Sequence, residues 1–262
     1  MFRVRRTSGS VVPVLLVLLG LAAAAAPAPA QDAGPDPYTF VAEWTIARDQ
    51  WAGFAQWTAK NHQPILERLA ADGTLLSWGV FESYIHEEGA MTHGAWWTAA
   101  TFAGIEKART ELLKAPSHPA AAAGAHRDYL LRAQIHGGRP GAVSGGFLHV
   151  SMQEMRPGRG ADWTKLWRRT SEPVLADLVS KGALASYSVY SEDVHTGPPT
   201  MRMIVTVSTG AEAEDQIEAA FDAAIAARSE GEREAYWSQV RETTVAESHR
   251  DYMARVTAAW NK

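Results

Sequence analysis

The sequence predicts an α+β protein in which one structural unit is used twice. The main observation is that Pro64–His86 recurs without a gap at Pro173–His195, 109 residues later. Proline, three leucines, glycine, serine, valine and the final histidine are unchanged between these copies. A second echo, His-Arg-Asp-Tyr, begins the segments His126–Leu130 and His249–Met253. Repeats of this length indicate a duplicated architecture, so both halves should contain the same elements in the same order.

Each half is expected to begin with a β-strand. Tyr38–Ile46 and its counterpart Phe147–Met155 both alternate between apolar and other residues. A period of two is typical of a strand. One face is apolar in each copy, and the opposite face carries Glu43 in the first and His149 in the second. We expect the apolar faces to pack against helices.

A helix with a bend should follow the first strand in each half. Pro64 and Pro173 occupy matching positions inside the two helical patterns. Proline removes an internal hydrogen bond, so it kinks a helix or makes it restart. Gly73 and Gly182 then end the pattern, because glycine readily adopts the left-handed conformation found after helices.

The remaining elements complete both halves. Two further strands, a helix and a fourth strand are expected in each, the fourth strand opened by the His-Arg-Asp-Tyr echo. The expected ranges are Leu75–Ile85, Met91–Ala99, Phe102–Leu113 and Tyr129–His136 in the first half, and Leu184–Val194, Thr200–Ser208, Glu212–Arg228 and Tyr252–Ala258 in the second. The second half has 14 more residues between its copies, which we place in an extra helical piece, Glu232–Ser248.

The order β-α-β-β-α-β is that of the ferredoxin-like motif. Helices on one face of such a sheet leave the other face bare, and two sheets can bury these faces against each other. The predicted fold is therefore two ferredoxin-like repeats, residues 31–137 and 147–262, whose antiparallel sheets face each other as an intramolecular α+β barrel. A glycine-rich linker at residues 138–146 joins them.

With this element order and repeat, the chain after residue 30 resembles the dimeric α+β barrel superfamily in tandem form, which includes antibiotic-biosynthesis-monooxygenase-like proteins. The resemblance implies one of several classes: cofactor-free monooxygenases, haem-handling proteins, chlorite-dismutase-like enzymes, dye-decolourising peroxidases or members of unknown role. A shared fold does not choose among them.

The first 30 residues have the pattern of a signal peptide. Arg3, Arg5 and Arg6 precede an apolar run at Val11–Ala26, and small residues follow at Ala28–Ala30. This order predicts cleavage before Gln31 and a periplasmic or secreted protein. The apolar run is short for a membrane-spanning helix, which needs about 20 residues.

Composition excludes several classes of function. The chain has no cysteine, which rules out disulfides and thiolate chemistry. Cleavage would remove three arginines and no acidic residue, changing the formal charge from −4 to −7. An acidic protein lacks the basic surface that nucleic acids require. We expect no nucleic-acid partner, no membrane contact after cleavage and no metal site, and a homodimer is compatible with the sequence.

Polar residues on the presumed inner strand faces are the candidate ligand-binding residues. The superfamily resemblance places a ligand in the barrel, on the sheet face away from the helices. The candidates are Glu43, His93, Trp97, Arg132, His149, Arg202 and Arg255. Arg132 and Arg255 match across the repeat, and their guanidinium groups suit a carboxylate or another anion. The alternative is a polar core in which these charges neutralise each other.

The His-Arg-Asp-Tyr echo gives four more residues of interest: His126, Asp128, His249 and Asp251. One interpretation places a histidine–aspartate pair at the barrel mouth in each half. The other is structural, with the aspartate and arginine closing a turn before the fourth strand and the tyrosine packed beneath.

The sequence favours an exported protein that binds a small organic or anionic molecule between its two sheets. The alternative is a cofactor-independent monooxygenase-like enzyme that uses a barrel histidine as base. Haem is a third hypothesis, with His93 or His149 as the axial ligand. Whether the protein is an enzyme stays open at this level, since no catalytic constellation is visible.

Overall fold

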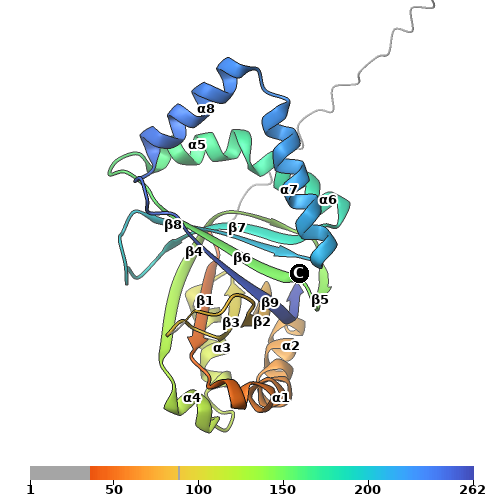
Figure 1. Cartoon of the computed structure of the whole chain (residues 1–262). Helices are drawn as coiled ribbons and strands as arrows, with labels where there is room; N and C mark the ends of the chain where they lie inside the picture. Colours follow the sequence, from red (N-terminus) through yellow and green to blue (C-terminus); the bar gives the residue numbers. More distant parts are fainter. Residues whose placement is uncertain (1–35, 88) are drawn as a thin grey trace, which may run out of the picture. The chain divides into compact units, whose positions relative to one another are not determined.

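The strands form one closed antiparallel sheet. The computed structural model describes residues 36–87 and 89–262, so the predicted signal peptide lies outside the described residues. Within them the strand order is β2-β3-β1-β4-β7-β8-β6-β9-β5, and β2 also pairs with β9. That extra pairing closes eight strands into a barrel and leaves β5 attached beside β9 (Figure 1). The α+β class and the barrel are therefore as predicted.

The strands are β1 (Tyr38–Trp44), β2 (Ser77–Ser83), β3 (His93–Ala99), β4 (His126–Gly138), β5 (Gly141–Val143), β6 (Phe147–Glu154), β7 (Leu184–Glu192), β8 (Met201–Ser208) and β9 (Arg250–Asn261). The helices are α1 (Trp51–Asn61), α2 (Gln63–Ala71), α3 (Phe102–Leu112), α4 (Pro119–Ala123), α5 (Gly160–Thr170), α6 (Glu172–Lys181), α7 (Ala211–Ala226) and α8 (Glu230–Thr243), with a short 3₁₀ turn at Arg48–Gln50. Among the described residues, no helix has the length and apolar character needed to cross a membrane.

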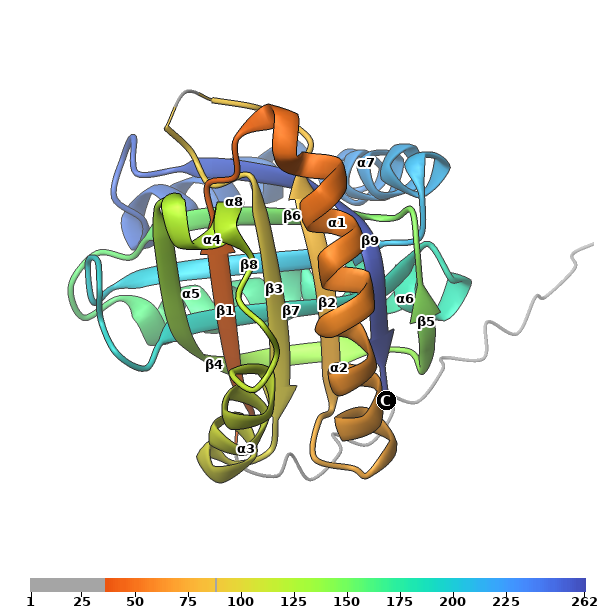
Figure 2. The same cartoon turned by 90° about the horizontal axis from the view of Figure 1, so that it is seen from below.

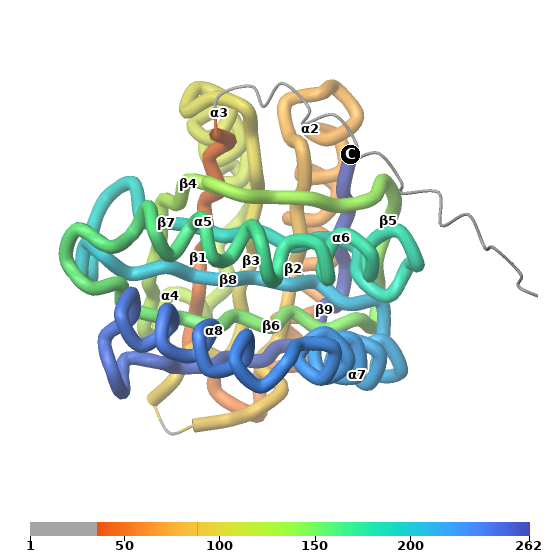
Figure 3. The backbone as a smooth tube through the Cα atoms, turned by 90° about the horizontal axis from the view of Figure 1, so that it is seen from above, coloured from red at the N-terminus to blue at the C-terminus, as the bar shows by residue number. Residues whose placement is uncertain are grey.

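The two halves of the chain join through their outer strands. Along the sheet, β2-β3-β1-β4 come from the first half and β7-β8-β6-β9 from the second. Strand β4 pairs with β7, and β9 pairs with β2. The strands of the first half cross those of the second (Figure 2), with α1–α4 outside the first set and α5–α8 outside the second (Figures 2 and 3). Each strand therefore has a helix side and a barrel side.

Proline and glycine set the helix boundaries as expected. Pro64 and Pro173 lie in the first turns of α2 and α6, so in both halves the helix restarts instead of continuing. Gly73 and Gly182 follow these helices with φ of 78° and 83°. These left-handed conformations cost glycine little and end the helices at matching points of the two copies.

Two apolar cores lie between helices and strands. In the first half, Leu66 and Leu69 of α2 and Ile105 of α3 pack with Trp78 and Trp97 of the sheet. In the second half, helix residues such as Trp163, Leu175 and Leu178 pack with sheet residues that include Tyr187 and Val189. These cores hold the helix layers on the barrel.

A third apolar core fills the barrel itself. Two clusters made of strand side chains meet there and share Val41, Val150 and Val205. Val256 is fully buried and Phe81 is 2% exposed. An eight-stranded barrel has an interior just wide enough for side chains to fill it. A few polar side chains also lie on the barrel side: the Thr39 hydroxyl oxygen is 2.8 Å from that of Thr98 and 3.4 Å from that of Tyr190.

Several element boundaries differ from the expected ones. The fourth strands begin at His126 and Arg250, so most of the His-Arg-Asp-Tyr echo lies within strands rather than in a turn before them. The predicted linker contains part of β4 and all of β5, which pairs with β9. The extra helical piece is α8, and it ends at Thr243, because the chain then returns to pair with β6.

Candidate functional site

The predicted ligand-binding residues do not converge on one pocket. Of the seven, Glu43 points to the barrel side, the side that Val41 and Thr39 of β1 also face. In β3 the predicted inner face is wrong by one residue, so the side chains expected in the barrel face the helices. His93 contacts Trp51 and Phe54 of α1, and Trp97 belongs to the helix-side core, whereas the neighbouring Trp96 packs into the barrel.

The expected orientation is also corrected in the second half. The apolar face of β6, with Leu148, Val150 and Met152, fills the barrel instead of packing on helices. His149 therefore points outward and its side chain is 42% exposed. Arg202 lies on the same outer side, beside Gly160 at the start of α5. The physical reason is that the barrel interior is itself an apolar core and takes the apolar face.

Arg132 and Arg255 also point outward and do not form the expected pair. The Nε of Arg132 lies 3.2 Å from Oδ1 of Asp193, and its guanidinium carbon is 3.7 Å from the centre of the Tyr38 ring. The guanidinium of Arg255 lies over Phe147, at 5.3 Å. Neighbouring residues of their strands, such as Leu131, fill the barrel in their place.

A different set of polar side chains lies at the edge of the apolar core inside the barrel. We call Glu43, Arg127, Tyr129 and Tyr252 the barrel-mouth cluster. The Nη2 and Nε atoms of Arg127 donate to Oε2 of Glu43 at 2.8 and 3.2 Å. The Arg127 guanidinium also lies 4.8 Å from the centre of the Tyr129 ring. The Glu43 side chain is 10% exposed and that of Arg127 is 52% exposed, so the pair reaches from the interior to solvent.

Both tyrosines of the cluster are held in the neutral phenol form. Burial, assisted by the nearby Glu43 carboxylate and opposed by Arg127, raises the pKa of Tyr129 to about 12. Burial, assisted by Glu43, also raises the pKa of Tyr252 above its ordinary value. The Tyr252 hydroxyl oxygen is buried; the Ser83 side chain lies close enough to lower its pKa, but no described residue meets the hydroxyl with the distance and angles of a hydrogen bond. Such an unsatisfied buried donor is uncommon and calls for an explanation.

Sequence reasoning missed three of these four residues. Tyr129 and Tyr252 occupy the same position of the repeated echo, and that duplication was the available signal. Arg127 faces Glu43 across the β1–β4 ladder, which becomes visible only when the register is known. The position of Glu43 is taken by Met152 in the second half, where it lies opposite Arg250. The charged pair therefore exists in one half only.

The histidines and aspartates of the echo form ion-pair contacts on the outer side. His126 Nε2 lies 3.0 Å from Asp128 Oδ1, and His249 Nε2 lies 3.1 Å from Asp251 Oδ1. Ser151 Oγ is 2.9 Å from the same Nε2 atom of His249. A serine–histidine–aspartate relay needs the two ring nitrogens to contact different partners, so this trio is not arranged as a catalytic triad.

Neither histidine proposed as a haem ligand fits that role inside the barrel. His93 is 4% exposed and packs edge-on against the Trp51 and Phe54 rings, with Nδ1 3.0 Å from Thr92 Oγ1. His149 is on the outer side. In the described chain, no histidine belongs to the clusters that fill the barrel, and residues 36–87 and 89–262 hold no group of three or more side chains arranged for a metal ion.

Comparison with known structures identifies the fold. No protein-family model matches the sequence, and no curated protein does. A candidate monooxygenase from Lactobacillus acidophilus NCFM superposes with a TM-score of 0.60 at 10% identity, over 86% of this chain and 96% of that one. A second candidate monooxygenase, from Fusobacterium nucleatum subsp. nucleatum, gives 0.59 at 8% identity, over 87% and 95%. An anthrone oxidase-like protein gives 0.50 at 10% identity, over 87% and 93%. These likenesses show that the chain shares an α+β barrel fold with these proteins, in agreement with the predicted fold class.

Proposed function

We propose that the protein is exported and binds a small organic molecule at the barrel-mouth cluster, between strands of its two halves. The observation that supports this most strongly is the buried Tyr252 hydroxyl, which has no hydrogen-bond partner among the described residues. It lies in the field of the Glu43–Arg127 pair, which is partly open to solvent. A ligand oxygen at this point would satisfy the donor, and the cost of leaving it unsatisfied is about 1–3 kcal/mol.

The cluster favours a neutral ligand with a carbonyl oxygen over an anion. Glu43 already neutralises Arg127, while Tyr129 and Tyr252 remain protonated and can donate hydrogen bonds. The arginines that were expected to attract an anion, Arg132 and Arg255, point away from the barrel. A ketone or quinone therefore matches the donors better than a carboxylate does.

Ligand binding can be tested with neutral polycyclic ketones, anthrone and anthraquinone among them, by the rise in melting temperature. The wild-type protein should be stabilised, and Tyr252→Phe should lose that stabilisation because the phenol donor is gone. Tyr187→Phe is the matched control, since Tyr187 is a buried strand tyrosine on the helix side. Equal stabilisation of the wild type and Tyr252→Phe would contradict the proposed site.

A cofactor-independent monooxygenase-like activity is the second candidate function. The support is the likeness in fold to two candidate monooxygenases and an anthrone oxidase-like protein. In such a reaction a substrate methylene carbon loses two hydrogens and gains one oxygen from O₂, and the other oxygen leaves as water. The base would be Glu43 rather than a histidine, because Glu43 is the carboxylate beside the two phenols.

Oxygen uptake separates the enzyme from a binding protein. With anthrone as substrate, an enzyme should consume O₂, and Glu43→Gln should abolish uptake while Tyr187→Phe preserves it. If anthrone raises the melting temperature but the wild type consumes no O₂ above the uncatalysed rate, the enzymatic candidate is wrong and the binding function stands.

Export rests on the residue order at the N-terminus. Basic residues, an apolar run and the small residues Ala28–Ala30 follow one another in the order found in cleavable signal peptides, so the mature chain should begin at Gln31. The intact mass of protein recovered from the periplasm or medium tests this, and a full-length chain retained in membranes would contradict it.

We further propose that residues 31–137 and 147–262 are copies of one ferredoxin-like unit, supported by matching strand orders of β2-β3-β1-β4 and β7-β8-β6-β9.

A further inference from the structure

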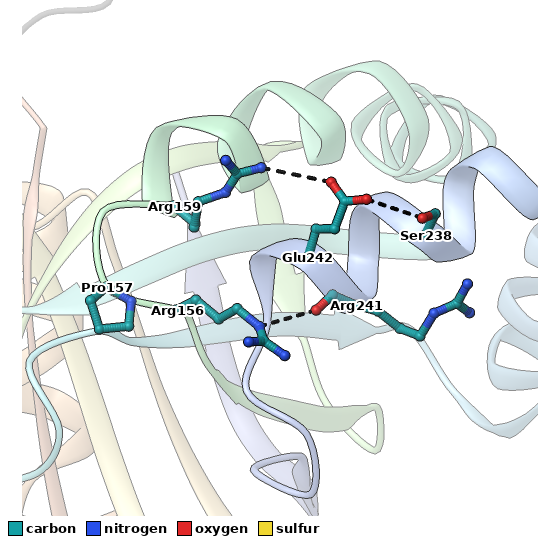
Figure 4. A pocket seen from close by; sticks show the side chains of 6 residues that line it. All are labelled: Arg156, Pro157, Arg159, Ser238, Arg241 and Glu242. Carbon is teal, nitrogen blue, oxygen red and sulfur yellow. Dashed lines mark hydrogen bonds and ion pairs between the residues drawn. The ribbon is translucent and has the colours of Figure 1, made fainter.

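A hollow of about 520 Å³ lies on the surface between the start of α5 and the C-terminal part of α8 (Figure 4). It is far in sequence from Glu43 and independent of the barrel-mouth cluster. Its walls are Arg156, Pro157, Arg159, Ser238, Arg241 and Glu242, which we call the arginine pocket. Three of these six residues are arginines, although the whole chain has a formal charge of −4.

Arg156 is held in place by backbone atoms. Its Nε donates to the carbonyl oxygens of Arg241 at 3.1 Å and Thr244 at 3.0 Å, where α8 ends. These bonds use Nε alone, and Figure 4 shows the rest of the guanidinium beside the contact. Among the described residues, the Arg156 guanidinium has no carboxylate within ion-pair distance. Its terminal nitrogens are therefore available to an added anion.

Arg159 lies directly before α5 and is only loosely paired. Nη1 is 3.3 Å from Asp162 Oδ2, and Nη2 is 3.9 Å from Glu242 Oε2, which is longer than a hydrogen bond. Its Nε is buried without a partner among the described residues. No side chain caps α5, so the first N–H groups of this helix add partial positive charge beside Arg159.

Arg202 adds a further positive charge beneath the start of α5. A Cβ placed on Gly160 would lie 3.3 Å from Arg202 Nη2, so the guanidinium packs against the first residue of the helix. Arg202 is half-buried, and its buried Nε has no partner in the described chain. A guanidinium withdrawn from water without a counter-ion is unfavourable. The helix start therefore carries more positive charge than its neighbouring carboxylates balance.

We propose that the arginine pocket binds the phosphate group of a small phosphorylated molecule. A phosphate offers several strong acceptor oxygens, so one group can accept two N–H bonds from the guanidinium of Arg159. The N-terminus of a helix also favours this anion. Arg241 is exposed at the rim and contributes long-range attraction. The volume exceeds that of a phosphate alone, which leaves room for the organic part of the ligand.

Glu242 gives the proposal an unusual consequence. Its carboxylate lines the pocket, accepts a hydrogen bond from Ser238 Oγ at 3.1 Å and is the nearest competitor for Arg159 Nη2. A bound phosphate would be repelled by this charge. Removing the charge should therefore strengthen phosphate binding, whereas removing a charge from Arg159 should weaken it.

Isothermal titration of the protein with inorganic phosphate at low ionic strength tests the proposal. Arg159→Gln should weaken binding about tenfold, as expected for losing a hydrogen bond to a charged group. Glu242→Gln should tighten it roughly threefold, in the range of exposed charge interactions. Arg169→Gln is the matched control, since Arg169 also connects α5 to α8, through Gln239, but lies outside the pocket. Added sodium chloride should weaken binding in the wild type.

Several outcomes would overturn the proposal. One is equal phosphate affinity in the wild type, Arg159→Gln and Arg169→Gln. Another is weaker binding in Glu242→Gln, and a third is absence of any binding heat in the wild type. Acetate competing as well as phosphate at equal ionic strength would refute the phosphate assignment. Circular dichroism confirms that each variant is folded, and the opposite signs expected for Arg159→Gln and Glu242→Gln keep the test independent of a general loss of stability.

Discussion

His126 Nε2 lies 3.0 Å from Oδ1 of Asp128, two residues further along β4. Side chains two residues apart project from the same face of a strand, so the contact follows from the strand itself. The second copy repeats it between His249 and Asp251, at 3.1 Å. The echo thus encodes a contact at the start of each fourth strand, while the tyrosine that follows points into the barrel.

Asp128→Asn should cost less than about 1 kcal/mol of unfolding free energy, because both partners are substantially exposed and such pairs contribute little. Burial raises the pKa of the Asp128 carboxyl against the opposing effects of His126 and Arg109, so the contact adds little net stability. Urea unfolding measures the loss. Asp251→Asn is the matched variant, and its loss should be slightly larger since His149 also lies 3.5 Å from Asp251. A loss above roughly 2 kcal/mol in Asp128→Asn would contradict the exposed-pair interpretation.

Gly79→Ala should destabilise the barrel by about 1–3 kcal/mol, the usual cost of overpacking a core. A Cβ on Gly79 would lie 2.0 Å from the Trp96 ring. A Cβ on Gly94 would lie 2.2 Å from the Phe81 ring, so Gly94→Ala should destabilise the barrel in the same way. Gly53→Ala is the control: nothing lies within 4 Å of its Cβ position in α1, and alanine favours a helix. A melting temperature of Gly79→Ala equal to or above that of the wild type would refute the close packing of Trp96 on Gly79.

Stability should fall as the pH drops from about 6.5 toward 4, because two histidines are buried in neutral form. Burial lowers the pKa of His93 to about 4, assisted by the charge of Arg48, and burial alone lowers that of His62 to about 4. Below pH 6.5 these histidines take up protons in the unfolded chain but not in the folded chain, so proton binding stabilises the unfolded state and the free energy of unfolding falls. His93 alone should account for roughly 2 kcal/mol between pH 6.5 and 5.

The measurement is the unfolding free energy of the wild type and His93→Gln across this range. The variant should be less stable at neutral pH and should show a shallower dependence on pH. His195→Gln, which removes an exposed hairpin histidine, should keep the wild-type slope. Parallel curves for wild type and His93→Gln would show that His93 is not the group responsible.

Residues 31–138 expressed alone should dimerise or precipitate. The isolated half would leave β4 without β7 and β2 without β9, and free strand edges recruit other chains. Its barrel side would also expose Phe81 and Trp96, which belong to the barrel core. Size-exclusion chromatography with light scattering gives the oligomeric state. A stable soluble monomer would contradict a shared barrel.

The order of elements could be predicted because it depends on local patterns. The sequence shows the alternation in β1, the prolines in the first turns of α2 and α6 and the glycines that follow these helices. The duplication supports the spacing of these elements. Barrel closure followed from the need to cover two bare sheet faces.

The orientation of individual side chains could not be predicted reliably, for two physical reasons. In β3 two adjacent tryptophans, Trp96 and Trp97, remove the alternation that marks an inner face, and a slip of one residue reverses every side chain. In β6 the alternation is clear, but both sides of the strand can meet an apolar core. A pattern such as Leu148-Val150-Met152 therefore does not tell the barrel from the helix layer.

Closure of the barrel depends on strand β9. Its 12 residues pair with β2, β5 and β6. Without β9, both β2 and β6 would lack a hydrogen-bonded neighbour on one side, and the seam between the two halves of the chain would be open. A break in this one strand would therefore unpair both sides of the seam at once.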